Sequence, residues 1–259
     1  MRLRAEGLAH AWEGLEALGP LDLVVEPGER LAVIGPSGCG KSTLLALLGG
    51  LLRPSRGRVL LEGEPPPGSL VPVAYVFQDF ALLPWRTVEA NVALPLEDRL
   101  GAAERRERVR AALARTRLSD FARAHPRQLS GGMRQRVGIA RALVVEPGVL
   151  LLDEPLSALD AQTRELLLEE VLTLTRGATL VWVTHHLEEA VRVADRVVLL
   201  TARPGRIRTV LEVPIPEAER SRPAALAELA RLRLRLWELL REDARRAEAA
   251  LLVAGDGAA

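Results

Sequence analysis

Short apolar runs and helix-like periodic segments alternate along most of this chain. The apolar runs have the length and composition of buried strands and lie at residues 30–34, 57–63, 71–77, 148–152, 179–183 and 196–200. Residues 42–48, directly after the first run, have the apolar character of a buried helix. Strands that alternate with helices form parallel sheets with both faces covered. The pattern therefore predicts an α/β fold with a mostly parallel sheet.

Two other segments depart from this alternation. Residues 1–30 have the pattern of short strands, with turn signals at 13–14, 19–20 and 27–28. From about residue 88 to residue 145 the periodicity is helical, and arginine and glutamate are dense between 102 and 117. This second segment predicts a solvated helical subdomain over about 86–146.

The C-terminal part has a third pattern. Prolines punctuate residues 214–223, which predicts a linker, and residues 224–250 have a helical period. Their leucines form one apolar stripe, at Leu229, Leu232, Leu236 and Leu240. We expect this stripe to pack on the chain's own surface, and contact with a partner or a membrane is the alternative. We expect one domain at 1–213 and a linker with a helical extension at 214–259.

Composition narrows the class of protein. The chain has 259 residues, 48% of them hydrophobic, so it can bury a full core as one large or two small domains. A formal net charge of +1 argues against a protein that coats nucleic acid. There is no run of 18 apolar residues, and the start lacks the apolar stretch of a secretory signal. We therefore place the chain in the cytoplasm and expect membrane contact only through a partner.

One glycine-rich segment joins the first apolar run to the helix that follows it. It fits the phosphate-loop pattern G-x-x-x-x-G-K-[ST] and consists of Gly35, Pro36, Ser37, Gly38, Cys39, Gly40, Lys41, Ser42 and Thr43. The glycines let backbone amides approach phosphates, and the helix start adds free N–H groups and a positive dipole end. We expect Lys41 to bind the outer phosphates and the Ser42 hydroxyl to ligate Mg²⁺.

Two details of this segment support the prediction. Lys41 is the only lysine among 35 basic residues, and its slender side chain can reach phosphate oxygens where a guanidinium would not fit. A glycine-rich turn with a chance lysine is the alternative, but strand, loop, hydroxyl and helix all agree with a phosphate loop. Cys39 is the only cysteine, so no intramolecular disulfide forms; a small filler is expected there rather than a reactive thiol.

Two adjacent carboxylates, Asp153 and Glu154, follow the apolar run at 148–152. Ligands of open parallel sheets bind at the carboxyl ends of the strands, so both acids should lie near the phosphate loop. Asp153 can hold Mg²⁺ directly or through water, and Glu154 can orient a water for attack on the terminal phosphate. The alternative is a polar strand end capped by Pro155. This alternative is less favoured, because it does not explain two adjacent acids near a phosphate loop.

A second candidate phosphate site lies in the run Leu129-Ser130-Gly131-Gly132-Met133-Arg134-Gln135-Arg136. A serine cap and two glycines predict a helix that continues to Leu143. Amides at the start of that helix could hold phosphate as the first loop does. The residues alone leave open which nucleotide they serve.

Taken in order, these motifs resemble an ABC-type ATPase domain over about residues 3–212. The resemblance rests on the phosphate loop, Gln78, the run 129–136, Asp153 with Glu154, the run Ser157-Ala158-Leu159-Asp160, and His185. It implies a P-loop NTPase core with an antiparallel β subdomain and a helical subdomain, and it implies ATP and Mg²⁺ as ligands.

The resemblance also implies roles for single residues. In that family two cassettes pair head to tail, so Ser130 and Gly132, with Gly131 and Gln135 in the same run, would serve the nucleotide of the other chain. Asp160 would organise the interface, and Gln78 would ligate Mg²⁺ and sense the membrane subunit. Trp12 would stack on adenine, with core filling as its alternative.

The switch histidine is the last role that the resemblance implies. His185 would contact the terminal phosphate, and a cap of the helix that starts near Leu187 is the alternative. His186 stands where relatives commonly carry Asp, which leaves an ambiguity between the two histidines. Because the predicted strand at residues 180–184 ends immediately before His185, we assign the switch role to His185.

Two further segments, 80–96 and 203–207, are similar to the ATPases of nitrate/sulfonate/taurine-type importers. An apolar stretch with Trp85 soon after Gln78 suits a groove that receives a partner's helix, and ordinary packing of the helical subdomain is the alternative. The resemblance implies an ATP-hydrolysing importer subunit, peripheral on the cytoplasmic side of the membrane. Its partners would be a second ATPase chain, transmembrane permease subunits and, indirectly, a solute-binding protein, with no nucleic acid. A homodimer is favoured, and the sequence leaves pairing with a different ATPase chain as the alternative.

Two other classes remain as alternatives. A soluble ABC ATPase that acts on DNA or the ribosome generally carries long insertions or two cassettes in one chain, and this sequence shows neither. A phosphate-loop kinase is disfavoured by the run 129–136. The transported solute is left open, because selectivity would reside in the permease and the binding protein.

Overall fold

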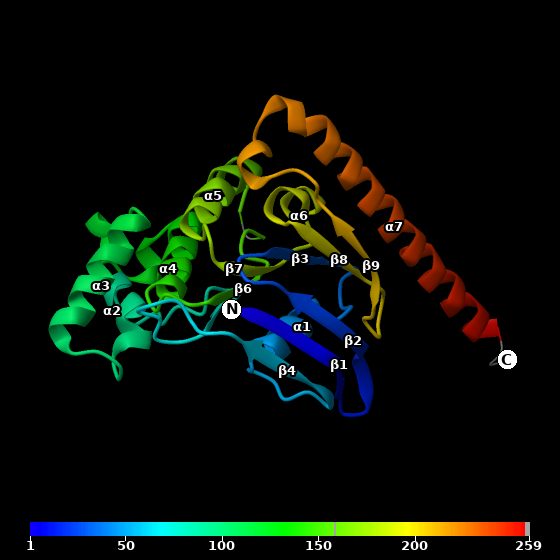
Figure 1. The fold of residues 1–259 in the computed structure, drawn as a ribbon, viewed down its shortest axis with the longest axis horizontal. Helices are drawn as coiled ribbons and strands as arrows, with labels where there is room; N and C mark the ends of the chain where they lie inside the picture. The colour runs from blue at the N-terminus through cyan, green and yellow to red at the C-terminus, as the bar shows by residue number, and fades with distance from the viewer. Residues whose placement is uncertain (158, 257–259) are drawn as a thin grey trace. The chain divides into compact units, whose positions relative to one another are not determined.

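The structure, a computed structural model, describes residues 1–157 and 159–256 (Figure 1). The chain divides into two compact units. The helical unit comprises residues 1–2, 26–28 and 62–180, and the phosphate-loop unit comprises residues 3–25, 29–61 and 181–259. The predicted end of the first domain at residue 213 and the predicted helical subdomain at about 86–146 are not tested by this division and stay predictions.

The helical unit contains a parallel strand pair covered by helices. Strand β5 (Val73–Val76) pairs in parallel with β6 (Val149–Asp153). The helices are α2 (Val88–Ala93), α3 (Ala102–Arg115), α4 (Gly131–Leu143) and α5 (Ala161–Leu174), with short 3-10 turns η1 (Leu94–Leu96), η2 (Ser119–Phe121) and η3 (Pro126–Gln128). Apolar residues of α2, α3 and α4, among them Val92, Leu113 and Val137, form one buried cluster. The helical character predicted for 88–145 is confirmed, whereas α5 was not anticipated.

The phosphate-loop unit contains a small antiparallel sheet. Its strands β1 (Arg2–Trp12), β2 (Leu15–Val25) and β4 (Arg56–Glu62) lie in the order β2-β1-β4. The turns predicted at 13–14 and 27–28 are present, but the turn predicted at Gly19-Pro20 is wrong, because both residues lie inside β2. Since β2 is an edge strand and its register shifts between the pairs Leu8–Leu21 and His10–Leu18, a proline without an N–H is tolerated there.

The same unit contains the strands that carry the glycine loop. Strand β3 (Arg30–Ile34) pairs in parallel with β8 (Arg196–Leu200), and β8 pairs antiparallel with β9 (Ile207–Glu212), a strand that was not anticipated. Helix α1 (Lys41–Leu48) follows the glycine loop, and α6 (Leu187–Val193) follows β7 (Thr179–Val183), which begins in the helical unit. Parallel pairs in both units and one small antiparallel sheet confirm the predicted fold class.

Helix α7 (Pro223–Asp256) packs on the core of the phosphate-loop unit through residues 225–240 and contacts α6 (Figure 1). Its Leu229 and Leu236 are buried with residues of β8 and α6, and Leu232 and Leu240 pack beside them. The expectation that this stripe packs on the chain's own surface is therefore confirmed. Among the described residues, no helix combines the length and the apolar composition that a membrane span requires.

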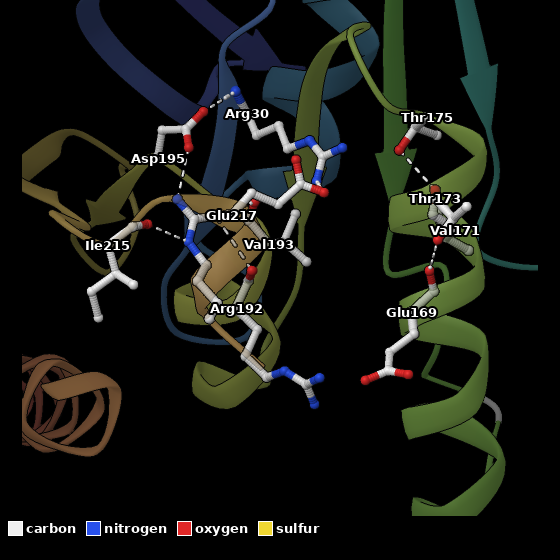
Figure 2. A network of polar contacts seen from close by, with 11 residues as sticks. Arg30, Glu169, Val171, Thr173, Thr175, Arg192, Val193, Asp195, Ile215 and Glu217 are labelled. Carbon is white, nitrogen blue, oxygen red and sulfur yellow. Dashed lines mark hydrogen bonds and ion pairs between the residues drawn. The ribbon is translucent and has the colours of Figure 1, made fainter. Parts of the chain in front are cut away.

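A buried arginine holds the linker before α7 to this unit. Arg220, only 2% exposed, donates to the carbonyl oxygens of Ile215 (2.8 Å) and Val193 (3.0 Å) and to Asp195 Oδ1 (2.7 Å). Asp195 also accepts from the backbone N–H of Arg30, whose guanidinium forms an ion pair with Glu217 (Figure 2). The predicted linker at 214–223 thus contains the turn η4 (Glu217–Glu219) and is fixed by charged hydrogen bonds.

Replacing this arginine should destabilise the chain. Arg220→Met would leave the carbonyl oxygens of Ile215 and Val193 and the Oδ1 atom of Asp195 without this donor, so we expect the free energy of unfolding to fall by about 2–4 kcal/mol. Urea unfolding measures the change. Arg222→Met is the matched control, because Arg222 is exposed and pairs only with Glu219 on the surface, where a pair contributes at most about 1 kcal/mol. Equal losses in both variants would refute the structural role of Arg220.

Candidate functional site

The glycine loop runs from the end of β3 to the start of α1 in a conformation that requires its glycines. Gly38 and Gly40 have φ angles of +73° and +101°, in the left-handed region. A Cβ atom at Gly40 would lie 2.9 Å from the carbonyl oxygen of Ala17, and one at Gly35 would lie 3.0 Å from that of Leu200. Other residues would displace the loop, so the glycines serve both backbone conformation and close packing.

Lys41 lies at the first position of α1 and is buried, with 7% of its surface exposed. Its Nζ donates to the carbonyl oxygens of Gly35 (2.9 Å) and Pro36 (3.0 Å), so the ammonium arches back over the loop. Ser42, the next residue, is exposed at the helix start. A cation, a hydroxyl and the amides of a helix N-terminus therefore face the same place, an arrangement that suits an anion of several phosphates.

Cys39 is packed inside the loop. Its thiol is 1% exposed, and burial raises its pKa, although the charge of Lys41 opposes this effect. A neutral, covered thiol is a poor nucleophile. These features agree with the expectation of a small filler.

The two histidines follow β7 in a turn held by a buried carboxylate. The Thr184 backbone N–H donates to the carbonyl of Val33, two residues before the glycine loop (3.2 Å). Its hydroxyl donates to Glu189 Oε2 (2.8 Å) and accepts from the His186 N–H (3.0 Å). His185 is exposed beside the half-buried His186, with ring centroids 4.0 Å apart. The exposed imidazole near the loop is therefore that of His185, which favours it over His186.

The helix after these histidines shows which residue caps it. The N-cap position of α6 is His186, and its side chain makes no capping hydrogen bond with the described residues. The capping alternative for His185 is therefore wrong.

Trp12 ends β1 and is half exposed. Its ring lies nearly perpendicular to the ring of His10, with centroids 4.7 Å apart. A half-exposed ring is not core filler, so that alternative is wrong, and the free face could stack on a flat ligand.

In the helical unit, three polar residues predicted for the site lie together. Asp153, at the end of β6, accepts a hydrogen bond from the Tyr75 hydroxyl (2.9 Å), and burial and then the Asp153 charge raise the pKa of that phenol. Gln78 Nε2 donates to Glu154 Oε2 (3.4 Å). Glu154 has φ +44°, and its carbonyl accepts from the Ser157 hydroxyl (3.0 Å). A left-handed backbone is unfavourable for a non-glycine residue, so contacts around Glu154 must maintain this conformation.

The run 129–136 forms the helix start that the sequence predicts. Ser130 is exposed and caps α4, and its Oγ accepts from the Met133 N–H (3.3 Å). A Cβ atom at Gly132 would lie 3.2 Å from Leu167, so the glycine lets the start of α4 pack close to Leu167. Gln135 is a correction, because its side chain is completely buried and offers no surface to a ligand. We therefore leave Gln135 out of the proposed site.

Asp160 caps the next helix, α5. Its two carboxylate oxygens accept from the Thr163 N–H (2.9 Å) and hydroxyl (2.7 Å), and these bonds lower the pKa of Asp160. The side chain is exposed, so capping leaves it accessible to another chain. Ala158, in the same predicted run, lies outside the described residues.

The predicted site residues divide between the units. The phosphate-loop unit contains Trp12, Gly35–Thr43 and His185; the helical unit contains Gln78, Ser130–Gly132, Asp153, Glu154 and Asp160. The expected Mg²⁺ ligands Ser42, Gln78 and Asp153 supply a hydroxyl, an amide and a carboxylate, which are oxygen donors of the kind Mg²⁺ prefers. No cluster of three or more His, Cys, Asp or Glu that could hold a metal ion occurs in the described part of the chain.

Sequence reasoning missed three residues that shape the site. Tyr75 bonds Asp153, Glu189 holds the turn before the histidines, and Arg203 donates to the glycine loop. Tyr75 is the only tyrosine of the chain and lies on a strand, which was a usable signal. Glu189 bonds a residue only five positions away, whereas the contact of Arg203 joins segments 165 residues apart and cannot be seen in a local pattern.

Comparison with known proteins identifies the family. The family model described as ABC transporter matches residues 18–157. An uncharacterized ABC transporter ATP-binding protein of Methanocaldococcus jannaschii is 41% identical over 252 residues, which cover 94% of this chain and 92% of that protein. An aliphatic sulfonates import ATP-binding protein of Bacillus licheniformis is 46% identical over 202 residues, covering 77% and 78%.

A solved structure agrees with these relatives. It is the dimer of an ATP-binding cassette in a post-hydrolysis state with ADP and Pi, and it is 31% identical with a TM-score of 0.71. The match covers 83% of this chain and all of that chain. The chain therefore belongs to the ABC transporter family, as one of its ATP-binding proteins and an ATPase.

Proposed function

We propose that this chain is the ATP-hydrolysing subunit of an ABC importer and couples ATP binding and hydrolysis to solute uptake. The observation that carries this proposal is the cluster of Gln78, Asp153 and Glu154 in a chain that also has a complete phosphate loop. A phosphate loop alone binds nucleotide. Glu154, which lies beside the Asp153 carboxylate and the Gln78 amide, adds a group that can orient an attacking water.

The proposed reaction is in-line attack of water on the terminal phosphate. Glu154 orients the water, while Lys41, His185 and Ser130 of the other chain stabilise charge that develops on the phosphate oxygens. Trp12 stacks on adenine. Bound Mg²⁺, held by Ser42, Gln78 and Asp153, would neutralise part of the phosphate charge.

The proposed active unit is a homodimer. Ser130 and the glycine loop both start helices suited to phosphate, yet they belong to different units. The similar cassette was solved as a dimer bound to ADP and Pi, which supports pairing of this chain as well. Each nucleotide would then lie between the glycine loop of one chain and Ser130–Gly132 of the other, and Asp160 would lie at that interface.

The proposed permease contact is a groove in the helical unit, of about 570 Å³. Its floor is apolar, from Ala93, Val109 and Leu113, and its rim is charged. Trp85, 72% exposed, lies nearby in sequence, and the adjacent Arg86 bonds Glu97 on the groove rim. Phe80, at the start of the segment 80–96, does not contribute, because it is buried. An apolar groove with a charged rim suits the amphipathic helix of a partner.

The importer type and location follow from the same argument. Segments 80–96 and 203–207 resemble nitrate/sulfonate/taurine-type ATPases, and one relative is named as an aliphatic sulfonates import protein. We place the chain at the cytoplasmic side of the membrane, where permease subunits hold it. A solute-binding protein would deliver the solute to these subunits. We propose no nucleic-acid partner.

Replacing Trp85 should test this function. Co-purification from native membranes should recover transmembrane subunits with the natural chain, and Trp85→Ala should lower their yield about tenfold or more, because a large aromatic anchor is lost. ATP binding by the isolated chain should not change. Trp237→Ala is the matched control, since Trp237 is also exposed but lies on α7. The transporter proposal fails if no membrane protein accompanies the natural chain; undiminished recovery with Trp85→Ala refutes the docking site alone.

A further inference from the structure

The turn between β8 and β9, residues 201–206, lies against the glycine loop for a topological reason. Strands β3 and β8 are parallel neighbours, and Ile34 pairs with Leu199, so both strands end at the same edge. The glycine loop leaves β3 at that edge, and the turn leaves β8 there. The two segments, more than 160 residues apart in the sequence, are thereby brought together.

The turn is closed by its own hydrogen bonds. Thr201 Oγ1 accepts from the Arg206 N–H (3.0 Å) and donates to the Pro204 carbonyl (3.1 Å). Gly205 N–H donates to the carbonyl of Ala17 on β2 (3.0 Å), and the Gly205 carbonyl accepts from Gly19 N–H (3.0 Å). The turn is therefore fixed to β2 independently of its contacts with the glycine loop.

Two residues of this rigid turn touch consecutive peptide groups of the glycine loop. Arg203 Nε donates to the Gly38 carbonyl (3.3 Å). Gly205 lies so close to the Cys39 carbonyl that a Cβ atom would approach its oxygen to 2.1 Å. The turn thus faces the carbonyl oxygens of two successive loop peptides.

This placement favours an anion. In a trans peptide the N–H points away from the C=O, so the Cys39 carbonyl, which faces the turn, directs the N–H of Gly40 to the opposite side. The Cys39 N–H donates to the Pro36 carbonyl (3.3 Å), so the Gly38–Cys39 peptide is fixed at both ends and holds the loop in this conformation. A loop with its carbonyls turned inward would repel phosphate instead of binding it.

Arg203 adds a charge to this contact. Its side chain is exposed and has no other hydrogen bond or ion pair with the described residues. Arg206, three positions on, lies over Gly19 and pairs with Glu16 (3.9 Å), so it contacts β2 instead. One turn therefore contains two exposed arginines, of which one bonds the phosphate loop.

We propose that Arg203 is a positioning residue for the nucleotide phosphates, acting through the Gly38 carbonyl to keep the loop in its phosphate-binding conformation. The inference rests on the proposed function, because it assigns the loop to ATP. Since the loop holds the phosphates common to ATP and ADP, the effect of Arg203 should be the same for both nucleotides.

Calorimetric titration of Arg203→Gln with Mg-ATP and Mg-ADP tests this role. We expect the Kd of both nucleotides to rise by the same factor, about three- to tenfold, which corresponds to the loss of one exposed charged hydrogen bond. In ATPase assays KM should rise while kcat stays within about twofold of the natural value. Arg206→Gln, the matched control, should leave both Kd values unchanged.

Every other outcome of these titrations would refute either the proposed function or the positioning role of Arg203. The natural chain is titrated first: absence of binding there refutes the proposed function itself. If the natural chain binds and Arg203→Gln binds equally well, only the role of Arg203 is refuted. Weaker binding of ATP alone would indicate contact with the terminal phosphate and would overturn positioning. Equal losses in Arg203→Gln and Arg206→Gln would assign the effect to the turn as a whole.

Discussion

A Glu154→Gln chain should retain ATP but hydrolyse it at least about a hundredfold more slowly than the natural chain. The proposed role of Glu154 is confined to orienting the attacking water, so binding energy is not lost with its charge. Glutamine has the same shape and keeps an oxygen that can accept from Gln78. A chain that binds ATP without turnover should also accumulate as a dimer.

Size-exclusion chromatography with ATP and a phosphate-release assay measure both effects. Glu146→Gln is the matched control, because Glu146 is an exposed glutamate that also has a left-handed φ, +51°, in the same unit. Its hydrolysis rate should be unchanged. Lys41→Ala should behave differently from Glu154→Gln, losing ATP binding together with hydrolysis. A glutamine variant that stays monomeric and hydrolyses normally would remove Glu154 from the mechanism.

Two inactive variants should restore each other's activity when mixed. Lys41→Ala damages the glycine loop of its own chain, whereas Ser130→Arg damages the site completed on the other chain. In a heterodimer of the two, one site receives both defects and the other receives none. Random pairing of equal amounts puts one intact site in half of the dimers, so the rate should recover to roughly a quarter of the natural value.

Phosphate release by the mixture, compared with each variant alone, measures this recovery. The natural chain should also lose specific activity on dilution, because a separated chain has only half of each site. Mixing Lys41→Ala with the natural chain gives the reference for pairing without complementation. A demonstrated monomer with concentration-independent activity would contradict shared sites and the closure on which the importer proposal depends.

Local patterns predicted the parts of this molecule that local chemistry determines. The serine cap and the two glycines placed the start of α4 at the correct residue, because a cap hydrogen bond is made within one turn. The glycine loop was placed correctly between a buried strand and a helix for the same reason. Its glycines satisfy two conditions, a left-handed backbone and nearby atoms of β2, and only the first is visible in a sequence.

The errors have a common physical origin in contacts between distant segments. Gly19-Pro20 has the composition of a turn, but Gly19 donates to Gly205 and makes room for Arg206, so the strand continues. Gln135 belongs to a polar run, yet the packing of α4 buries it completely. Strand β9 was missed because its strand conformation depends on antiparallel pairing with β8. Residue type alone predicts none of these outcomes.

The solitary lysine has a practical consequence for labelling. Every other basic side chain is a guanidinium, so amine-directed acylating reagents and cross-linkers find a single side-chain target, Lys41. Lys41 is buried, with 7% of the residue exposed, and its amine is bonded to two loop carbonyls, which shields it further. Apart from the α-amine of Met1, the surface therefore offers no amine to reagents that modify most proteins at many positions. Any adduct that does form on a side-chain amine reports directly on the interior of the phosphate loop.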